Sequence, residues 1–297
     1  MSSPEIHHFF HTPSDTFTYV IICPETKRCA IVDSALDYAY NAGRVSAEYA
    51  DQIMEYVQQQ GLEVEWLLDT HAHADHLSAA AYIKSKLGGK IGIGEHIKEV
   101  QQFFKGLFNI DDVSGSGDEF DHLFSDGETF SIGKIPVRVM HTPGHTPACV
   151  TYVVNEEAAF VGDTVFMPDY GTARCDFPNG SSKALYHSVR DKILALPEDT
   201  KLYMCHDYRP NAPGPRYVTT VKEERERNPL IHDGISEEAF VSIRDGIDRV
   251  LPAPQYILPS IQVNIRAGHM PSPEQNGKRY LKMPVNVLGS SDLELDF

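Results

Sequence analysis

The chain has 297 residues, enough for one large domain or two small ones and for a substantial hydrophobic core. Its 26 basic and 42 acidic side chains give a formal charge of −16, which argues against nucleic acid or an anionic membrane as partner. No apolar run approaches the roughly 20 residues that cross a bilayer, and the N-terminus lacks the basic and apolar regions of a signal peptide. The five cysteines show no zinc-ribbon or CxxC spacing, so we expect thiols of a reducing compartment and a cytoplasmic protein.

The first hundred residues alternate between strand and helix patterns. The predicted elements are a hairpin of strands 17–23 and 29–33, an amphipathic helix 46–60, a strand 66–70, a helix 76–87 and a strand 90–94. The last three form a β-α-β unit. This unit favours the α/β class.

The next segment, residues 103–124, is polar and rich in glycine around 114–119. We therefore expect a surface excursion there, with a lid over a binding site as the alternative. A second series of strands is predicted at 127–131, 136–140, 149–155, 158–162 and 202–205. The proline-rich stretch 211–215 is expected to form a rigid turn close to the last of these strands.

From about residue 231 the pattern changes. Residues 236–249 are predicted to form a helix with Ser236 as its N-cap. A tail containing Pro252, Pro254 and Pro259 follows, and we expect it to pack back on the body.

Three histidines and one carboxylate crowd into the run Thr70–His76, directly after the predicted strand 66–70. Neutral imidazoles and carboxylates are the ligands that hold zinc and iron in proteins. More such residues follow wherever a later strand is predicted to end, and strand ends on a rigid sheet can hold metal ligands precisely. The candidate ligands are His71, His73, Asp75, His76, His145, Asp163 and His206. The sequence therefore predicts a metal site.

An HxHxDH run followed by a distant His, Asp and His resembles the signature of the metallo-β-lactamase superfamily, over roughly residues 15 to 230. The resemblance implies an αββα sandwich, in which two mixed sheets face each other, helices cover the outside and the metal lies at one edge. We therefore expect a catalytic domain over 1–230, with the C-terminal helix and tail, 231–297, packed on the same domain.

Finer motifs are similar to those of the persulfide dioxygenase family, in its bacterial branch. The motifs are GTARCDF at 171–177, LYHSV at 185–189, HDY at 206–208, TVKEER at 220–225 and NIRAG at 264–268. This resemblance implies one iron(II) per chain, held by His71, His145 and Asp163. Two histidines and one carboxylate leave three positions open for substrate and oxygen, as in non-haem iron oxygenases. The residues that would then orient the ligands are His73, Asp75, His76 and His206.

The implied reaction oxidises glutathione persulfide with O2 and water to sulfite and glutathione. Arg174 is the candidate for holding a glutathione carboxylate, because a guanidinium can pair with it at two points. Its alternative role is an internal ion pair with Asp176. Tyr208 is expected to hydrogen-bond substrate or oxygen, or else to pack one edge of the pocket. Arg266 is a further substrate candidate whose alternative role is to anchor the tail.

Other interpretations remain open from the sequence alone. The seven ligand types by themselves favour a dinuclear zinc site, and a glyoxalase II-like thioesterase would use them to cleave a glutathione thioester. A non-catalytic sensor that kept the metal site is the third possibility. A homodimer is expected from the family resemblance only. Cys175 and Cys205 lie near predicted site residues, and we expect both to be packed rather than reactive.

Overall fold

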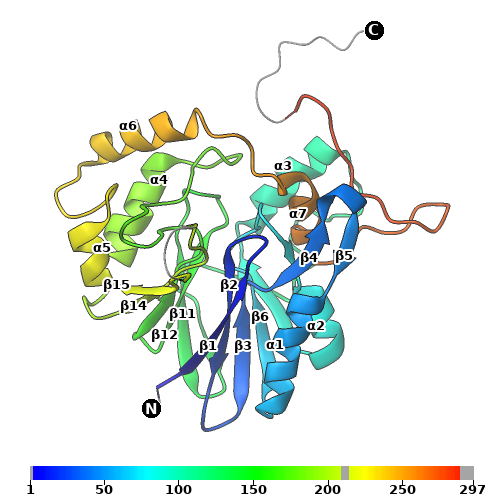
Figure 1. Ribbon diagram of the computed structural model, residues 1–297, viewed down its shortest axis with the longest axis horizontal. Coiled ribbons are helices and arrows are strands. Elements are labelled where there is room, and N and C mark those ends of the chain that lie inside the picture. The colour runs from blue at the N-terminus through cyan, green and yellow to red at the C-terminus, as the bar shows by residue number, and fades with distance from the viewer. Residues whose placement is uncertain (1–2, 209–213, 288–297) are drawn as a thin grey trace.

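The structure is a computed structural model that describes residues 3–208 and 214–287, so most of the predicted turn at 211–215 lies outside the described residues. Two six-stranded mixed sheets lie face to face between two layers of helices, and a small three-stranded sheet, β5-β4-β7, flanks them (Figure 1). This is the αββα sandwich that the sequence predicts. None of the helices in the described ranges is both long enough and apolar enough to cross a membrane.

The first sheet has the order β1-β2-β3-β6-β8-β9. Its strands are β1 (Glu5–His11), β2 (Thr16–Ile22), β3 (Arg28–Val32), β6 (Glu63–Leu68), β8 (Lys90–Gly94) and β9 (His122–Phe124). The second sheet has the order β10-β11-β12-β13-β14-β15. Its strands are β10 (Thr129–Ile132), β11 (Ile135–His141), β12 (Val150–Val154), β13 (Ala158–Phe160), β14 (Lys201–Tyr203) and β15 (Val218–Thr220). The small sheet contains β4 (Ala35–Ala39), β5 (Arg44–Ser46) and β7 (Leu77–Ser78).

Helices cover the outer face of each sheet. Those against the first sheet are α1 (Glu48–Gln59), α2 (Ala80–Leu87), α3 (Ile97–Phe108) and α7 (Ile257–Asn264). Those against the second sheet are α4 (Ser182–His187), α5 (Val221–Arg227) and α6 (Glu237–Asp248), with a π-helical turn continuing α4 over Ser188–Ile193. Ser236 caps α6 as predicted, since its hydroxyl accepts a hydrogen bond from the Ala239 amide.

Strand β2 explains why the two sheets stack. All of its residues are buried, and successive side chains of a strand point to opposite faces. Phe17 and Tyr19 therefore pack in the cluster between the sheets, whereas Val20 packs in the cluster under the helices. A strand that is buried on both faces needs a layer on each side, which the second sheet and the helices supply.

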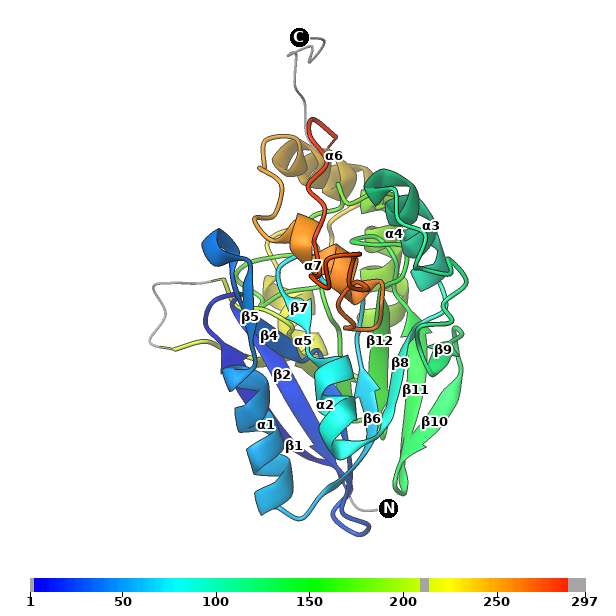
Figure 2. The ribbon, with the colours of Figure 1, turned by 90° about the vertical axis from the view of Figure 1, so that its right-hand side faces the viewer.

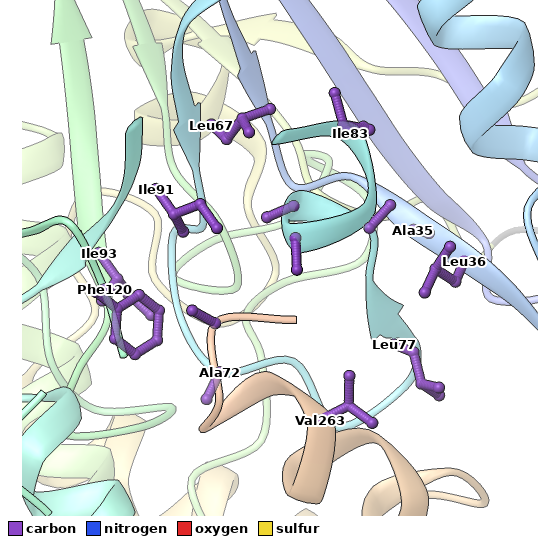
Figure 3. Close-up of a cluster of buried hydrophobic side chains, with 14 of the residues drawn as sticks. Ala35, Leu36, Leu67, Ala72, Leu77, Ile83, Ile91, Ile93, Phe120 and Val263 are labelled. Carbon is purple, nitrogen blue, oxygen red and sulfur yellow. The ribbon is translucent and has the colours of Figure 1, made fainter. Parts of the chain in front are cut away.

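The C-terminal segment shares these cores. Val263 of α7 lies beside Ala72 and Leu77 in the cluster under the first sheet (Figure 3). Phe240 of α6 is fully buried in the cluster under the second sheet. Figure 2 shows α6 and α7 at the same end of the sandwich as α3. Helix α6 thus packs on one half of the sandwich and helix α7 on the other.

The structure corrects three predictions. The helix expected over 76–87 begins only at Ala80, because Leu77 and Ser78 pair with β4 and the Ser78 amide donates to Asn264 Oδ1 at 2.7 Å. The 103–124 segment is not simply a surface excursion, because it starts within α3 and ends in β9, and Phe104 is fully buried. The tail expected after 249 contains α7, a buried helix despite its proline.

Candidate metal centre

The predicted ligands come together at one edge of the sandwich, from loops that follow strands of both sheets. The Thr70–His76 run follows β6 of the first sheet. In the second sheet, His145 follows β11, Asp163 follows β13 and His206 follows β14. The site therefore lies between the two sheets, where four strand ends meet.

Three of these residues form a compact group. Ligand atoms of His71, His145 and Asp163 all lie within 4.8 Å of one another. His71 Nε2 is 3.9 Å and His145 Nε2 is 3.7 Å from Asp163 Oδ2. This is the two-histidine, one-carboxylate set expected from the sequence.

A second group lies beside the first. Ligand atoms of His73, Asp75 and His76 also lie within 4.8 Å of one another. His206 Nε2 lies between the groups, 3.6 Å from Asp75 Oδ2 and 3.3 Å from Asp163 Oδ1. All seven predicted residues are thus gathered, and the arrangement offers donors for one metal ion or for two.

Five buried atoms of the site have no hydrogen-bond partner among the described residues, which indicates that the site fits a metal ion. These buried atoms are His71 Nε2, His73 Nδ1, His76 Nε2, His206 Nε2 and Asp163 Oδ1. Each unsatisfied buried polar group costs about 1–3 kcal/mol, so five of them at one place need a common partner. Each of the five atoms offers a lone pair, so cations bound in the two groups would satisfy them, and an ion in the first group alone would satisfy His71 Nε2 and Asp163 Oδ1.

Burial favours the uncharged form of two of the histidines. Burial lowers the pKa of His71 and of His73 well below the ordinary value. Both rings are therefore neutral at physiological pH. Neutral imidazole is the form that binds a metal.

Asp33 orients these two histidines, although the sequence analysis did not select it. Its Oδ1 accepts from the Thr70 amide at 2.7 Å and from His73 Nε2 at 3.0 Å, and its Oδ2 accepts from the Thr70 hydroxyl at 2.9 Å. Because that hydroxyl proton points to Asp33, Thr70 accepts from His71 Nδ1 at 3.0 Å. One carboxylate thus fixes both tautomers and leaves a lone pair of each ring facing the site. The signal for Asp33 is that it ends an apolar strand, as Asp163 does.

Backbone carbonyls orient two further rings. His145 Nδ1 donates to the Arg174 carbonyl at 2.7 Å, and His206 Nδ1 donates to the Asp15 carbonyl at 3.1 Å. The Nε2 atom of each ring is then an acceptor directed at the site. Orientation of this kind usually accompanies metal-binding histidines.

Thr16 is a second residue that the sequence analysis missed. Its buried hydroxyl donates to Asp75 Oδ2 at 3.0 Å and lies 2.7 Å from Ser14 Oγ. Ser14 in turn lies 2.7 Å from His11 Nδ1. This row of polar groups holds Asp75 in place, and nothing in the local sequence around Thr16 indicates it.

A cavity of about 510 Å³ opens onto the metal centre. Its floor contains Asp75, His145 and Asp163. The remaining lining residues are Ala74, Phe166, Tyr170, Thr172, Ala173, Arg174, Tyr208, Leu230, Arg244, Ile247, Leu251 and Pro254. A volume in the range of about 300–1,000 Å³ is typical of small-molecule sites.

The predicted substrate residues differ in where they lie. Arg174 lines the cavity and also makes the internal pair with Asp176, through two contacts of 2.6 Å. Tyr208 lines the cavity with its ring stacked on His206, the ring centres 4.9 Å apart. Arg266 lies away from the cavity, buried and paired with Asp112, in the anchoring position that was its alternative.

The 103–124 segment does not line the cavity. Residues 103–124 contribute no side chain to the lining of the cavity, so the described structure gives no lid there.

Cys175 and Cys205 are buried, and burial raises the pKa of both thiols. Both are therefore protonated, packed side chains, as expected.

A sandwich whose edge gathers histidine and carboxylate donors with free lone pairs is typical of a metal-dependent enzyme. The chain belongs to the metallo-β-lactamase superfamily, whose family model matches residues 11–206. Glyoxylase B2 of Dictyostelium discoideum is 49% identical over 286 residues, covering 96% of this chain and 98% of that protein. Human mitochondrial persulfide dioxygenase ETHE1 is 31% identical over 264 residues, covering 89% of this chain and 88% of that protein. The crystal structure of ETHE1 from Myxococcus xanthus matches with a TM-score of 0.72 at 26% identity, covering 89% of this chain and 100% of that one.

Proposed function

We propose that the protein is a persulfide dioxygenase, which uses one iron(II) held by His71, His145 and Asp163 to oxidise glutathione persulfide. One persulfide, one O2 and one water give one sulfite, one glutathione thiol and two protons. The observation that carries the proposal is the compact group of these three ligands, two of which, His145 and Asp163, lie at the floor of an open cavity. Three protein ligands leave the remaining coordination positions free for substrate and oxygen. The similarity to persulfide dioxygenases supports the same assignment.

The iron would supply the redox chemistry, binding the persulfide sulfur and activating oxygen. The chain's own residues bind and orient the substrate. Burial raises the pKa of Tyr208 well above the ordinary value, so its phenol stays protonated and can donate a hydrogen bond within the cavity. Apolar side chains of the wall, including Phe166 and Ile247, offer contact surface to the apolar parts of the substrate.

Arg174 can serve substrate binding and the internal pair together. A guanidinium has five N–H donors, and here two contact Asp176 and one contacts the Pro252 carbonyl. Two donors remain for a glutathione carboxylate. Arg174→Ala should therefore raise KM for glutathione persulfide about 10- to 150-fold while kcat changes little, as expected for the loss of about 1.5–3 kcal/mol of uniform binding. An unchanged KM would assign Arg174 to the internal pair alone.

The second candidate is a glyoxalase II-like hydrolase of glutathione thioesters with two metal ions. The observation that favours it is the second ligand group, His73, Asp75 and His76, beside the first. Two metal ions can hold a bridging hydroxide for attack on a thioester carbonyl. The 49% identity to a protein named glyoxylase adds support.

Metal content and substrate consumption separate the two candidates. Protein purified without oxygen is analysed for iron and zinc, and then tested for O2 uptake on glutathione persulfide and for hydrolysis of S-lactoylglutathione. About one iron per chain with persulfide-dependent O2 uptake is the expected result. Two metal ions per chain with thioester hydrolysis and no O2 uptake would refute the dioxygenase proposal. A cytoplasmic location and a homodimer remain predictions from the sequence.

A further inference from the structure

Asp248 of α6 is a buried acid that lies behind the segment contacting one candidate ligand. Its Oδ2 accepts from the Cys175 amide at 2.7 Å, across 73 positions of the chain. The carbonyl of the same peptide unit belongs to Arg174, and it accepts from His145 Nδ1 at 2.7 Å. A single peptide unit therefore joins the Asp248 carboxylate to a histidine of the metal centre.

The two contacts lie at opposite ends of this peptide unit. Its bond is trans, so the N–H and the C=O point in opposite directions. Asp248, the peptide unit and His145 thus form a row of hydrogen bonds, and bonds in such a row strengthen one another by about 10–30% each. Because a carbonyl only accepts, the ring proton of His145 lies on Nδ1, which leaves Nε2 free for a metal ion.

Arg244 pairs with Asp248 and keeps its carboxylate charged. Arg244 Nε and Nη2 donate to Asp248 Oδ1 at 3.0 and 2.6 Å, and Nη1 donates to the Thr172 carbonyl at 3.2 Å. Both side chains of the pair are buried, and a buried carboxylate stays ionised only when it is paired. Hydrogen bonds to a charged acceptor are stronger than those to a neutral one. The ion pair thus supplies a fixed, charged acceptor for the Cys175 amide.

We propose that Asp248 is a positioning residue of the metal centre, which acts on His145 through the Arg174–Cys175 peptide unit. The inference deepens the proposed function, because it rests on His145 as a metal ligand, and it holds for one metal ion or for two. The arrangement parallels that of His71, which the Thr70 hydroxyl links to the Asp33 carboxylate. A metal-binding histidine held in this way has a fixed ring and a more basic free nitrogen.

Two variants remove the carboxylate in different ways. Asp248→Asn keeps the shape of the side chain, but its one acceptor oxygen pairs with the two donors of Arg244, and the amide nitrogen then faces the Cys175 amide. The double variant Arg244→Met/Asp248→Leu replaces the whole ion pair by apolar side chains, a change that is often neutral or stabilising for buried pairs. The matched control Asp245→Asn removes the same charge from an exposed position of the same helix. Chemical denaturation measures the stability of each protein.

Metal affinity and one proton resonance are then compared with those of the wild-type protein. Iron(II), titrated without oxygen against a competing chelator, should bind about 10–100-fold more weakly to both Asp248 variants and as tightly as before to the control. Metal-free protein with isotope-labelled histidine reports the Nδ1 proton of His145, which is assigned by its absence in His145→Gln. This resonance should move upfield in both Asp248 variants, because a weaker hydrogen bond deshields its proton less.

The outcomes separate this inference from the proposed function. Wild-type iron affinity in the double variant would overturn the role of Asp248, while iron binding by the wild-type protein would still support the metal centre. Weaker affinity with an unchanged His145 resonance would contradict an effect that passes through the peptide unit. Lower stability of Asp248→Asn as its only change would assign the ion pair to the packing of α6 alone. A wild-type protein that binds no iron would refute the metal centre itself, and the positioning role with it.

Discussion

Replacing Asp33 by Asn tests whether one buried carboxylate sets up the metal centre. Asp33 accepts two donors on Oδ1, the Thr70 amide and His73 Nε2, and the Thr70 hydroxyl on Oδ2. An amide keeps a single acceptor oxygen. If that oxygen replaces Oδ1, the amide nitrogen faces the Thr70 hydroxyl, whose proton then has no acceptor.

The expected loss of stability follows from the number of donors that lose their acceptor. The opposite orientation of the amide would leave the Thr70 amide and His73 Nε2 unpaired. The first leaves the Thr70 hydroxyl and the weakly donating Cys205 thiol, 3.7 Å from Oδ2, so it is preferred, and one strong buried donor is lost at about 1–3 kcal/mol. Asp33→Asn should therefore lower the free energy of unfolding of the metal-free protein by this amount. It should also weaken metal affinity by about 10–100-fold, as changes in groups that orient metal ligands do.

The assay is chemical denaturation of metal-free protein, together with metal titration against a competing chelator. Asp15→Asn is the matched control, because Asp15 has the same left-handed backbone, with φ of 52° against 53°, and contacts His206 through its carbonyl. The control should change neither quantity. The reasoning is refuted if Asp33→Asn binds metal as tightly as the wild-type protein does.

Three further predictions concern other residues. Asp163→Ala should empty the metal site, whereas Asp75→Ala should retain most of the iron and lose about 10–100-fold in turnover; equal iron loss in elemental analysis would contradict a single-metal site. Burial raises the pKa of Glu224 to about 8, so the stability that this group contributes is complete below about pH 4.5 and is lost as the pH rises toward 8. In the presence of chelator, Tm of the Glu224→Gln variant should therefore decrease less than that of the wild-type protein as the pH rises over this range. The same dependence of Tm on pH in both proteins would contradict this role of Glu224. Arg266→Met should lower the free energy of unfolding by about 1.5–3 kcal/mol, because the contacts with Asp112 and the Gln262 carbonyl are lost. KM should stay unchanged, and a raised KM would instead indicate that Arg266 contributes to substrate binding.

The strands could be predicted because they carry their burial in the local sequence, whereas the sandwich was implied by the family resemblance. Strand β2 is mostly apolar and buried throughout, and the candidate ligands follow directly after strand patterns. Strand β7 could not be predicted, because a helical pattern follows Leu77 and Ser78 directly. These two residues are extended only because they pair with β4. Helix α7 was missed because a proline interrupts the pattern, although the first turn of a helix tolerates it.

The ligands could be predicted for the same reason, and their supporting residues could not. The HxHxDH run places four polar side chains within six positions, which is a local signal. Thr16 meets Asp75 across 59 positions, and Asp33 meets His73 across 40. Arg266 finds Asp112 across 154 positions. Contacts of this range depend on the completed tertiary structure, so a single sequence does not reveal which residues pair, although the position of Asp33 at a strand end is visible in it.

The position of the metal centre between the two sheets has a consequence for folding. His71 belongs to the first sheet and Asp163 to the second, about 90 residues later in the chain. An ion bound to both closes this long loop as a reversible cross-link, and closing a loop of about 100 residues is worth up to about 4.7 kcal/mol in the chain-entropy model for disulfides. A bound metal ion would thus join the two halves of the molecule, and metal supply would then affect how long newly synthesised protein resists unfolding and proteolysis.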